Sequence, residues 1–235
     1  QPLAPFREWA KADQSGGAKI WMQINHPGRQ VFKANNPEAI APSAVPVDMG
    51  DLSKMFAKPR AMTSADIGRV VDQFATTAAL AQEAGFDGVQ IHAAHGYLLS
   101  QFLSPKTNRR DDQWGGRIEN RARILIDIVQ AIRDRVGANF GLGVKLNSAD
   151  FQKGGLSAED STAVARMLEA ETVDLIEISG GTFEAPVAFA QSPAMESTRR
   201  REAYFLDYAE ATKAALSIPV MVTGGFRSAQ GMADA

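Results

Sequence analysis

Three proton-capable side chains lie close together after an apolar, strand-like segment. They are His92, His95 and Tyr97, in the segment GVQIHAAHGYLL. A neutral imidazole can donate a hydrogen bond to a carbonyl oxygen, and a phenol, with an ordinary pKa of about 10, can deliver a proton. One buried histidine is usually a core residue. Three such groups at the carboxyl end of one strand instead indicate a catalytic site, because parallel α/β folds place their chemistry there.

Polar side chains also recur on one side of the other strand-like segments. Successive residues of an extended backbone point to opposite faces, so each segment has one apolar and one polar face. The polar faces carry Gln23, Gln90, His92, Lys145, Asn147, Glu177, Ser179 and Thr223. A doubly wound sheet with helices on both faces usually has strands that are apolar throughout. The pattern therefore favours a barrel whose interior opens into a polar site.

Strands and helices are predicted to alternate along the chain. The predicted strands are 19–26, the segment from Gly85 to His92, 141–147, 174–181 and 218–225, and the predicted helices are 5–14, 63–85, 118–136, 157–171, 202–216 and one that begins at Ser228. Residues 27–62 form an unusually long connection, which we expect to fold back as a hairpin or to cover part of a site. The alternation predicts an α/β fold, a (β/α)8 TIM barrel, with five of its eight units in this chain.

Composition narrows the classes of function. The 235 residues, of which 45% are hydrophobic and 22% charged, are typical of one globular domain. A net charge of −2 without a dense basic run argues against nucleic-acid and membrane-surface partners. The lack of cysteine excludes disulfides and zinc–thiolate sites, and with His26 as the only further histidine we expect no metal site. No segment is typical of a signal peptide or membrane span, which predicts a cytoplasmic protein.

The segments that carry these residues resemble the old yellow enzyme family of FMN-dependent oxidoreductases. The resemblance rests on MQINHPGRQ, HAAHGYLLSQFLSP, NRR, GGR, IENRAR and VTGGFR, and it covers nearly the whole chain. It implies that residues 1–235 form a single FMN-binding TIM-barrel domain. Compared with the family, the chain lacks the first two strands and the eighth, and is therefore expected to be incomplete at both ends.

The resemblance also implies an activity, that of an ene-reductase. FMN would be reduced by NADH or NADPH and reoxidised by an activated alkene such as an α,β-unsaturated carbonyl compound, in a ping-pong mechanism. His92 and His95 would hold the carbonyl oxygen, and Tyr97 would protonate the α-carbon. A homo-oligomer is compatible with the family, which varies in oligomeric state, in substrate and in its preference for NADH or NADPH.

The remaining family positions concern the cofactor. Gln23 would bind the pyrimidine edge of the flavin through its amide, and Lys145, where the family usually has arginine, would place a cation near N1. Gly224, Gly225 and Arg227 would hold the phosphate, and Gly180 would allow close approach of the ligand. Considered without the resemblance, the glycine pairs are equally typical of turns. For Lys145 the alternative is a lysine that reaches solvent, which its position on the polar face of a buried strand disfavours.

Two other interpretations remain open. One is a barrel lyase, either a Schiff-base enzyme with Lys145 as the nucleophile or a metal-dependent enzyme. The chain could instead be a non-catalytic barrel fragment without cofactor. Colour separates the first interpretation from the leading one, because a holo-flavoprotein is yellow and a lyase is colourless.

Overall fold

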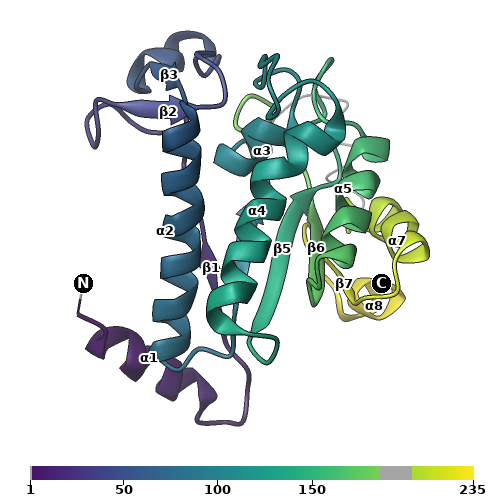
Figure 1. Ribbon diagram of the computed structural model, residues 1–235. Helices are drawn as coiled ribbons and strands as arrows, with labels where there is room; N and C mark the ends of the chain where they lie inside the picture. The colour runs from purple at the N-terminus through teal and green to yellow at the C-terminus, as the bar shows by residue number, and fades with distance from the viewer. Residues whose placement is uncertain (1, 186–202) are drawn as a thin grey trace.

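The protein is built on a five-stranded parallel sheet. The computed structural model describes residues 2–185 and 203–235 (Figure 1). The strands are β1 (Trp21–Ile24), β4 (Gly88–Ala93), β5 (Gly141–Asn147), β6 (Leu175–Ser179) and β7 (Val220–Val222). They lie in the order β1-β4-β5-β6-β7, and each pairs in parallel with the next. The five predicted strands and their parallel arrangement are confirmed.

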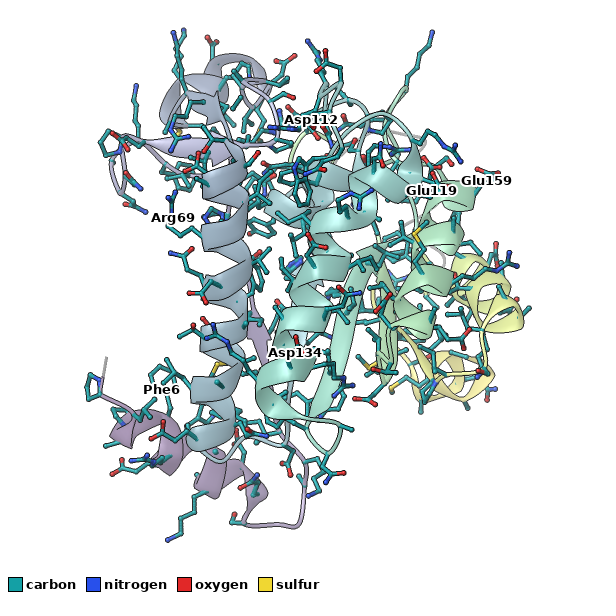
Figure 2. The ribbon with its side chains drawn as sticks, in the orientation of Figure 1. Phe6, Arg69, Asp112, Glu119, Asp134 and Glu159 are labelled. Carbon is teal, nitrogen blue, oxygen red and sulfur yellow. The ribbon has the colours of Figure 1, made fainter. Side chains whose placement is uncertain are left out.

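Helices cover one face of this sheet. The helices are α1 (Ala4–Gln14), α2 (Ser64–Glu83), α3 (Leu98–Leu103), α4 (Ile118–Val136), α5 (Ala158–Ala170), α7 (Leu206–Ala215) and α8 (Ala229–Asp234). Figure 1 shows α2, α4 and α5 side by side, in agreement with the contacts between neighbours in this row. Charged side chains on these helices, such as Arg69 on α2 and Asp134 on α4, are exposed (Figure 2). The polar residues of the strands lie on the opposite, inner face of the sheet.

The apolar core lies between the sheet and these helices. Val89, Ile91 and Val144 of the strands and Ile124 and Ile128 of α4 are fully buried. Every second strand residue therefore packs against a helix, as the period of two predicts. None of the helices among the described residues is long and apolar enough to cross a membrane.

The helix ends follow the capping residues in the sequence. The Thr63 side chain accepts a hydrogen bond from the Asp66 amide, and the Asp66 carboxylate accepts one from the Thr63 amide, which is a capping box at the start of α2. Ser157 caps α5 through the Asp160 amide, and Gly137 ends α4 with a φ of 74°. The helix that was expected to begin at residue 202 begins at Leu206, and residue 202 itself lies outside the described residues.

The long connection between β1 and α2 differs from the predicted hairpin. It contains β2 (Ala39–Ala41), the 3-10 helix η1 (Gly50–Met55) and β3 (Pro59–Ala61), and β2 and β3 pair in parallel. The chain passes through η1 between the two strands, so β3 runs in the same direction as β2. An antiparallel bridge joins Phe32 to Phe56. The prediction of a hairpin is therefore wrong for the β2–β3 pair.

Candidate active site

His92, near the end of β4, is in ring contact with His95 and Tyr97, which follow the strand. The ring centroids of His92 and His95 are 5.0 Å apart, and those of His92 and Tyr97 are also 5.0 Å apart. Both pairs are close to perpendicular, with interplanar angles of 82° and 76°. Tyr97 is also in edge contact with Phe183, at 5.8 Å. The chain therefore brings two imidazoles and one phenol together where β4 ends.

His95 is held by its neighbours rather than by regular secondary structure. Its φ is 59°, a left-handed backbone conformation that is uncommon for a residue with a side chain. Its amide donates to Asn147 Oδ1 at 3.0 Å, and its Nε2 lies 2.7 Å from Ser179 Oγ. Asn147 and Ser179 end the neighbouring strands β5 and β6, so β5 fixes the backbone of His95 and β6 fixes its imidazole. The sequence pattern places Asn147 and Ser179 on polar strand faces, but it does not indicate that they contact His95.

Both imidazoles of the pair are neutral near pH 7. Burial, together with the neighbouring His95 and the Lys145 cation, lowers the pKa of His92 to about 3. Burial and Lys145 lower the pKa of His95 to about 4, against the opposing effect of Glu177. His92 Nδ1 accepts a hydrogen bond from the Ala94 amide at 3.2 Å. The ring proton of neutral His92 therefore sits on Nε2, which can donate it to a ligand.

Buried neutral histidines make stability depend on pH, which gives a first prediction. The unfolded chain takes up a proton at each histidine as the pH falls through about 6.5, whereas folded His92 and His95 stay neutral until the pH approaches their lowered pKa values. The contribution of these two buried, neutral imidazoles to the free energy of unfolding is therefore fully present above pH 6.5 and decreases below it. We expect the free energy of unfolding to fall by on the order of 2 kcal/mol between pH 7 and pH 5.5. Urea unfolding at the two pH values measures this.

The matched control replaces both histidines. In the variant His92→Asn/His95→Asn the decrease should be much smaller, with a remainder from His26, whose pKa burial also lowers. An unchanged pH dependence in this variant would show that the two imidazoles are not the groups that resist protonation.

A row of polar side chains crosses the inner face of the sheet. Gln23 Nε2 donates to Gln90 Oε1 at 2.7 Å, and Gln90 Nε2 donates to Glu177 Oε2 at 2.6 Å. Lys145 Nζ donates to Glu177 Oε1 at 2.8 Å. The side chains of Lys145 and Glu177 are 15% and 8% exposed. Lys145 is thus an inward-facing, paired cation and not a lysine that reaches solvent.

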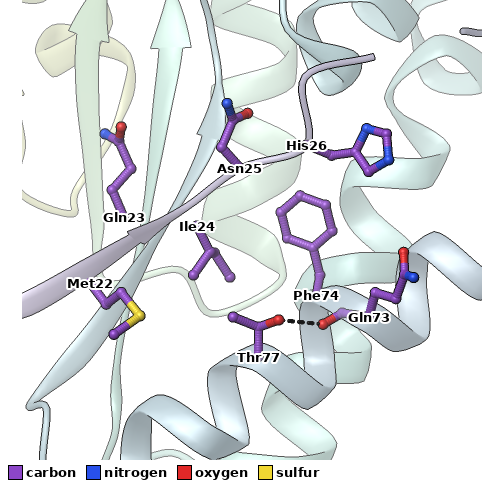
Figure 3. Close-up of a pocket in the computed structure, with 8 residues that line it drawn as sticks. All are labelled: Met22, Gln23, Ile24, Asn25, His26, Gln73, Phe74 and Thr77. Atoms are coloured by element: carbon purple, nitrogen blue, oxygen red, sulfur yellow. Dashed lines mark hydrogen bonds between the residues drawn. The ribbon is translucent and has the colours of Figure 1, made fainter. Parts of the chain in front are cut away.

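One pocket lies beside the edge strand β1. Its volume is about 300 Å³, and Figure 3 shows Gln23 and Asn25 on one side of the strand, with Ile24 on the side of Phe74 and Thr77 of α2. Gln23 is therefore accessible at the edge of the sheet while its amide also joins the polar row.

The glycines expected at the phosphate site lie after β7. Gly224 and Gly225 have φ values of 113° and 79°, which favour glycine. A Cβ atom on Gly225 would lie 2.6 Å from the ring of Tyr204, so glycine is also required by packing. Arg227 follows in an exposed loop, and Ser228 caps α8 by accepting from the Gly231 amide. The role of Gly224, Gly225 and Arg227 at a phosphate stays a prediction.

The residues present fit a flavin in their chemistry. Gln23 supplies an amide donor and acceptor, and Lys145 supplies a cation on the same inner face. A Cβ atom on Gly180 would lie 2.7 Å from the rings of Phe151 and Phe205, so side chains of the protein require glycine here and close approach of a ligand stays a prediction. Ser148 Oγ, which would lie 3.0 Å from the same atom, is buried without a hydrogen-bond partner among the described residues. Residues 2–185 and 203–235 contain no group of three or more His, Cys, Asp or Glu placed to hold a metal ion.

Comparison with known proteins agrees with this arrangement. A family model described as NADH:flavin oxidoreductase / NADH oxidase matches residues 2–235. The NADH-dependent flavin oxidoreductase nadA of Aspergillus parasiticus is 40% identical over 230 residues, which are 97% of this chain and 52% of that protein. An NADPH dehydrogenase of Geobacillus sp. is 40% identical over 176 residues, covering 75% of this chain and 49% of that protein. The chain spans about half the length of these curated relatives.

Solved structures show the same likeness. A complex of 2-naphthoyl-CoA reductase with 2-naphthoyl-CoA superposes on 99% of this chain with a TM-score of 0.89 and 31% identity, over 36% of that chain. An old yellow enzyme homologue from Zymomonas mobilis superposes on 99% of this chain with a TM-score of 0.78 and 26% identity, over 64% of that chain. The five-stranded sheet therefore corresponds to part of a TIM barrel.

Proposed function

Because this chain belongs to the NADH:flavin oxidoreductase / NADH oxidase family, we propose that it is the catalytic part of an FMN-dependent ene-reductase. NADH or NADPH would be the electron donor, and the C=C bond of an α,β-unsaturated carbonyl compound, or of a similarly activated alkene, would be reduced. The observation that carries the proposal is the pair of neutral imidazoles beside a phenol at the carboxyl end of β4. The proposal includes a cytoplasmic location.

The histidine pair would polarise the substrate. His92 would donate through Nε2 to the carbonyl oxygen of the alkene substrate. His95, on the loop that follows β4, would donate through Nδ1, with its Nε2 accepting from the Ser179 hydroxyl. Donors aimed at this oxygen make the β-carbon electrophilic and stabilise the charge that develops on the enolate oxygen. Two neutral donors achieve this without repulsion from the nearby Lys145 cation.

Tyr97 would complete the reduction. Its ring is held between His92 and Phe183, and its hydroxyl would protonate the α-carbon. FMN, when bound, supplies the hydride, and the residues that would hold it are Gln23, Lys145, Gly180, Gly224, Gly225 and Arg227. A single ammonium at Lys145 would take the place of the two-pronged guanidinium usual in the family.

The Schiff-base alternative is less well supported. A lysine nucleophile must present a free amine to a carbonyl carbon, but Lys145 Nζ is held by the Glu177 carboxylate at 2.8 Å. Gln90 holds the other carboxylate oxygen of Glu177, so the ion pair is fixed from both sides.

The visible absorbance spectrum tests the proposal. The purified protein should be yellow, its flavin absorbance should bleach when NADH or NADPH is added without oxygen, and the absorbance should return when an enone such as cyclohexenone follows. A colourless protein that takes up no FMN, or a flavin that no enone reoxidises, would contradict the proposed function.

A further inference from the structure

A second and larger pocket lies between the long connection and the loop that follows α3. Its volume is about 970 Å³, at the upper end of the range typical of ligand sites. We call it the anion pocket, because six cationic side chains line it, namely Arg29, Lys33, Lys54, Lys58, Lys106 and Arg109. The carboxylates in its lining are those of Asp48 and Glu184. The chain as a whole has a net charge of −2, so this excess of positive charge is local.

Arg29 and Glu184 build one wall of the anion pocket. Arg29 is 3% exposed, and its Nη2 lies 2.6 Å from Glu184 Oε2. Its Nη1 donates to the Pro46 carbonyl at 2.6 Å, and its Nε is buried without a partner among the described residues. Glu184 also accepts from the Asp48 amide at 2.6 Å. This buried pair joins the long connection to the segment after β6.

Three of these cations have no partner for their charged groups within residues 2–185 and 203–235. Lys54 pairs with Asp51, and Lys106 donates to Gln152. For Lys33, Lys58 and Arg109, the described part of the chain offers the charged groups neither a hydrogen bond nor an ion pair. Like charges gathered around one pocket repel one another, and a ligand with several negative charges removes that repulsion.

The anion pocket adjoins the candidate active site. Gln152, which accepts from Lys106, donates to Thr182 Oγ1 at 2.6 Å, and the Thr182 backbone pairs with that of His95. Phe183, the next residue, is in contact with Tyr97, and Glu184 follows it in the wall of the pocket. The wall of the anion pocket therefore follows directly in the chain on the residues that contact His95 and Tyr97.

We propose that the anion pocket binds the diphosphate group of a ligand whose reacting end lies beside Tyr97. The inference rests on the proposed function, because it assigns the pocket to a ligand of that site. A diphosphate carries several negative charges on a short group, which suits the clustered cations, and the volume of the pocket leaves room for the nucleotide attached to it. Two ligands of the reaction could bring it: the dinucleotide that donates the hydride, or an activated alkene carried on a nucleotide-containing thioester.

Direct binding tests the anion pocket without any turnover. Inorganic pyrophosphate, titrated calorimetrically into the purified protein, should bind, and binding should weaken as salt is added. The variant Lys33→Gln/Lys58→Gln/Arg109→Gln should bind it at least tenfold more weakly. Lys11→Gln, on α1 at the far end of the sheet from β2 and β3 (Figure 1), should bind it as the parent protein does.

Kinetics then identify which ligand brings the diphosphate. If the diphosphate belongs to the electron donor, flavin reduction by NADPH should be at least tenfold slower in the triple variant. Flavin reduction by N-benzyl-dihydronicotinamide, which has no phosphate, should be unchanged. If it belongs to the alkene, reoxidation by crotonyl-CoA should slow while reoxidation by cyclohexenone does not.

The outcomes separate the two proposals. Absence of pyrophosphate binding, or equal weakening by Lys11→Gln, would overturn the anion pocket. In a protein that NADPH reduces, pyrophosphate binding without an effect of the triple variant in either kinetic arm would also overturn it. A protein that binds pyrophosphate in the predicted manner but is reduced by no donor would support the anion site and overturn the proposed function.

Discussion

Replacing His92 and His95 together by alanine should slow alkene reduction by at least a hundredfold and abolish the binding of phenols that mimic the carbonyl substrate. Removing one donor to a developing oxyanion typically costs a factor of about 10² to 10³ in rate. The double variant should also slow reduction by NADPH, because the nicotinamide amide would use the same donors. Stopped-flow measurement of each half-reaction and absorbance titration with a phenol provide the test.

Tyr97→Phe is the matched comparison, because it removes a hydroxyl while keeping the ring that packs against His92 and Phe183. It should leave phenol binding and reduction by NADPH nearly unchanged and slow only reoxidation by an enone. Impairment of NADPH oxidation as severe as in the double histidine variant would identify Tyr97 as a binding residue and contradict its role as proton donor.

A loss of folding must be distinguished from a loss of donors. His92 is 6% exposed, so alanine leaves a cavity at the end of β4. The variant His92→Asn/His95→Asn keeps a side-chain donor at each position and should recover part of the phenol binding. If the asparagine variant is folded but binds no better than the alanine variant, donation by these side chains is not what holds the ligand.

The elements that the sequence predicts well are those with a clear period and a recognisable end. Residues 118–136 combine helical spacing of apolar residues with Gly137, and α4 has these bounds. The strand 141–147 alternates apolar and polar residues and is β5. In both cases local pattern and tertiary packing require the same conformation, so no competing interaction shifts the boundary.

The elements that the sequence does not reveal depend on distant contacts. The six residues of α3, Leu98–Leu103, are all buried, so they have no polar face from which a helical period could be read. The parallel pairing of β2 with β3 depends on where η1 directs the chain, which no local motif indicates.

The candidate site divides in the same way. His92, His95 and Tyr97 are close in the sequence, so their contact could be predicted from one strand end. The contact between His95 and Ser179 joins residues 84 positions apart and depends on the register of β4, β5 and β6. Polar faces indicated that Lys145 and Glu177 both point inward, but only the paired strands show that they form an ion pair.

That ion pair determines what substitution of Lys145 should do. Lys145→Met leaves the Glu177 carboxylate buried with Gln90 as its remaining partner, and breaking a buried ion pair from one side costs about 3 kcal/mol or more. We therefore expect urea unfolding to show a loss of stability of this size, accompanied by weaker retention of FMN. Lys145→Arg, which keeps a cation and restores the side chain usual in the family, should retain both.

The double variant Lys145→Met/Glu177→Gln separates the structural effect from the effect on the cofactor. It removes both charges, so much of the lost stability should return, because no uncompensated carboxylate remains. The flavin reduction potential should nevertheless stay below that of the parent protein, since a cation beside N1 favours the anionic reduced flavin and the double variant has none. A stable double variant with an unchanged reduction potential would show that Lys145 serves only to neutralise Glu177 and does not contact the flavin.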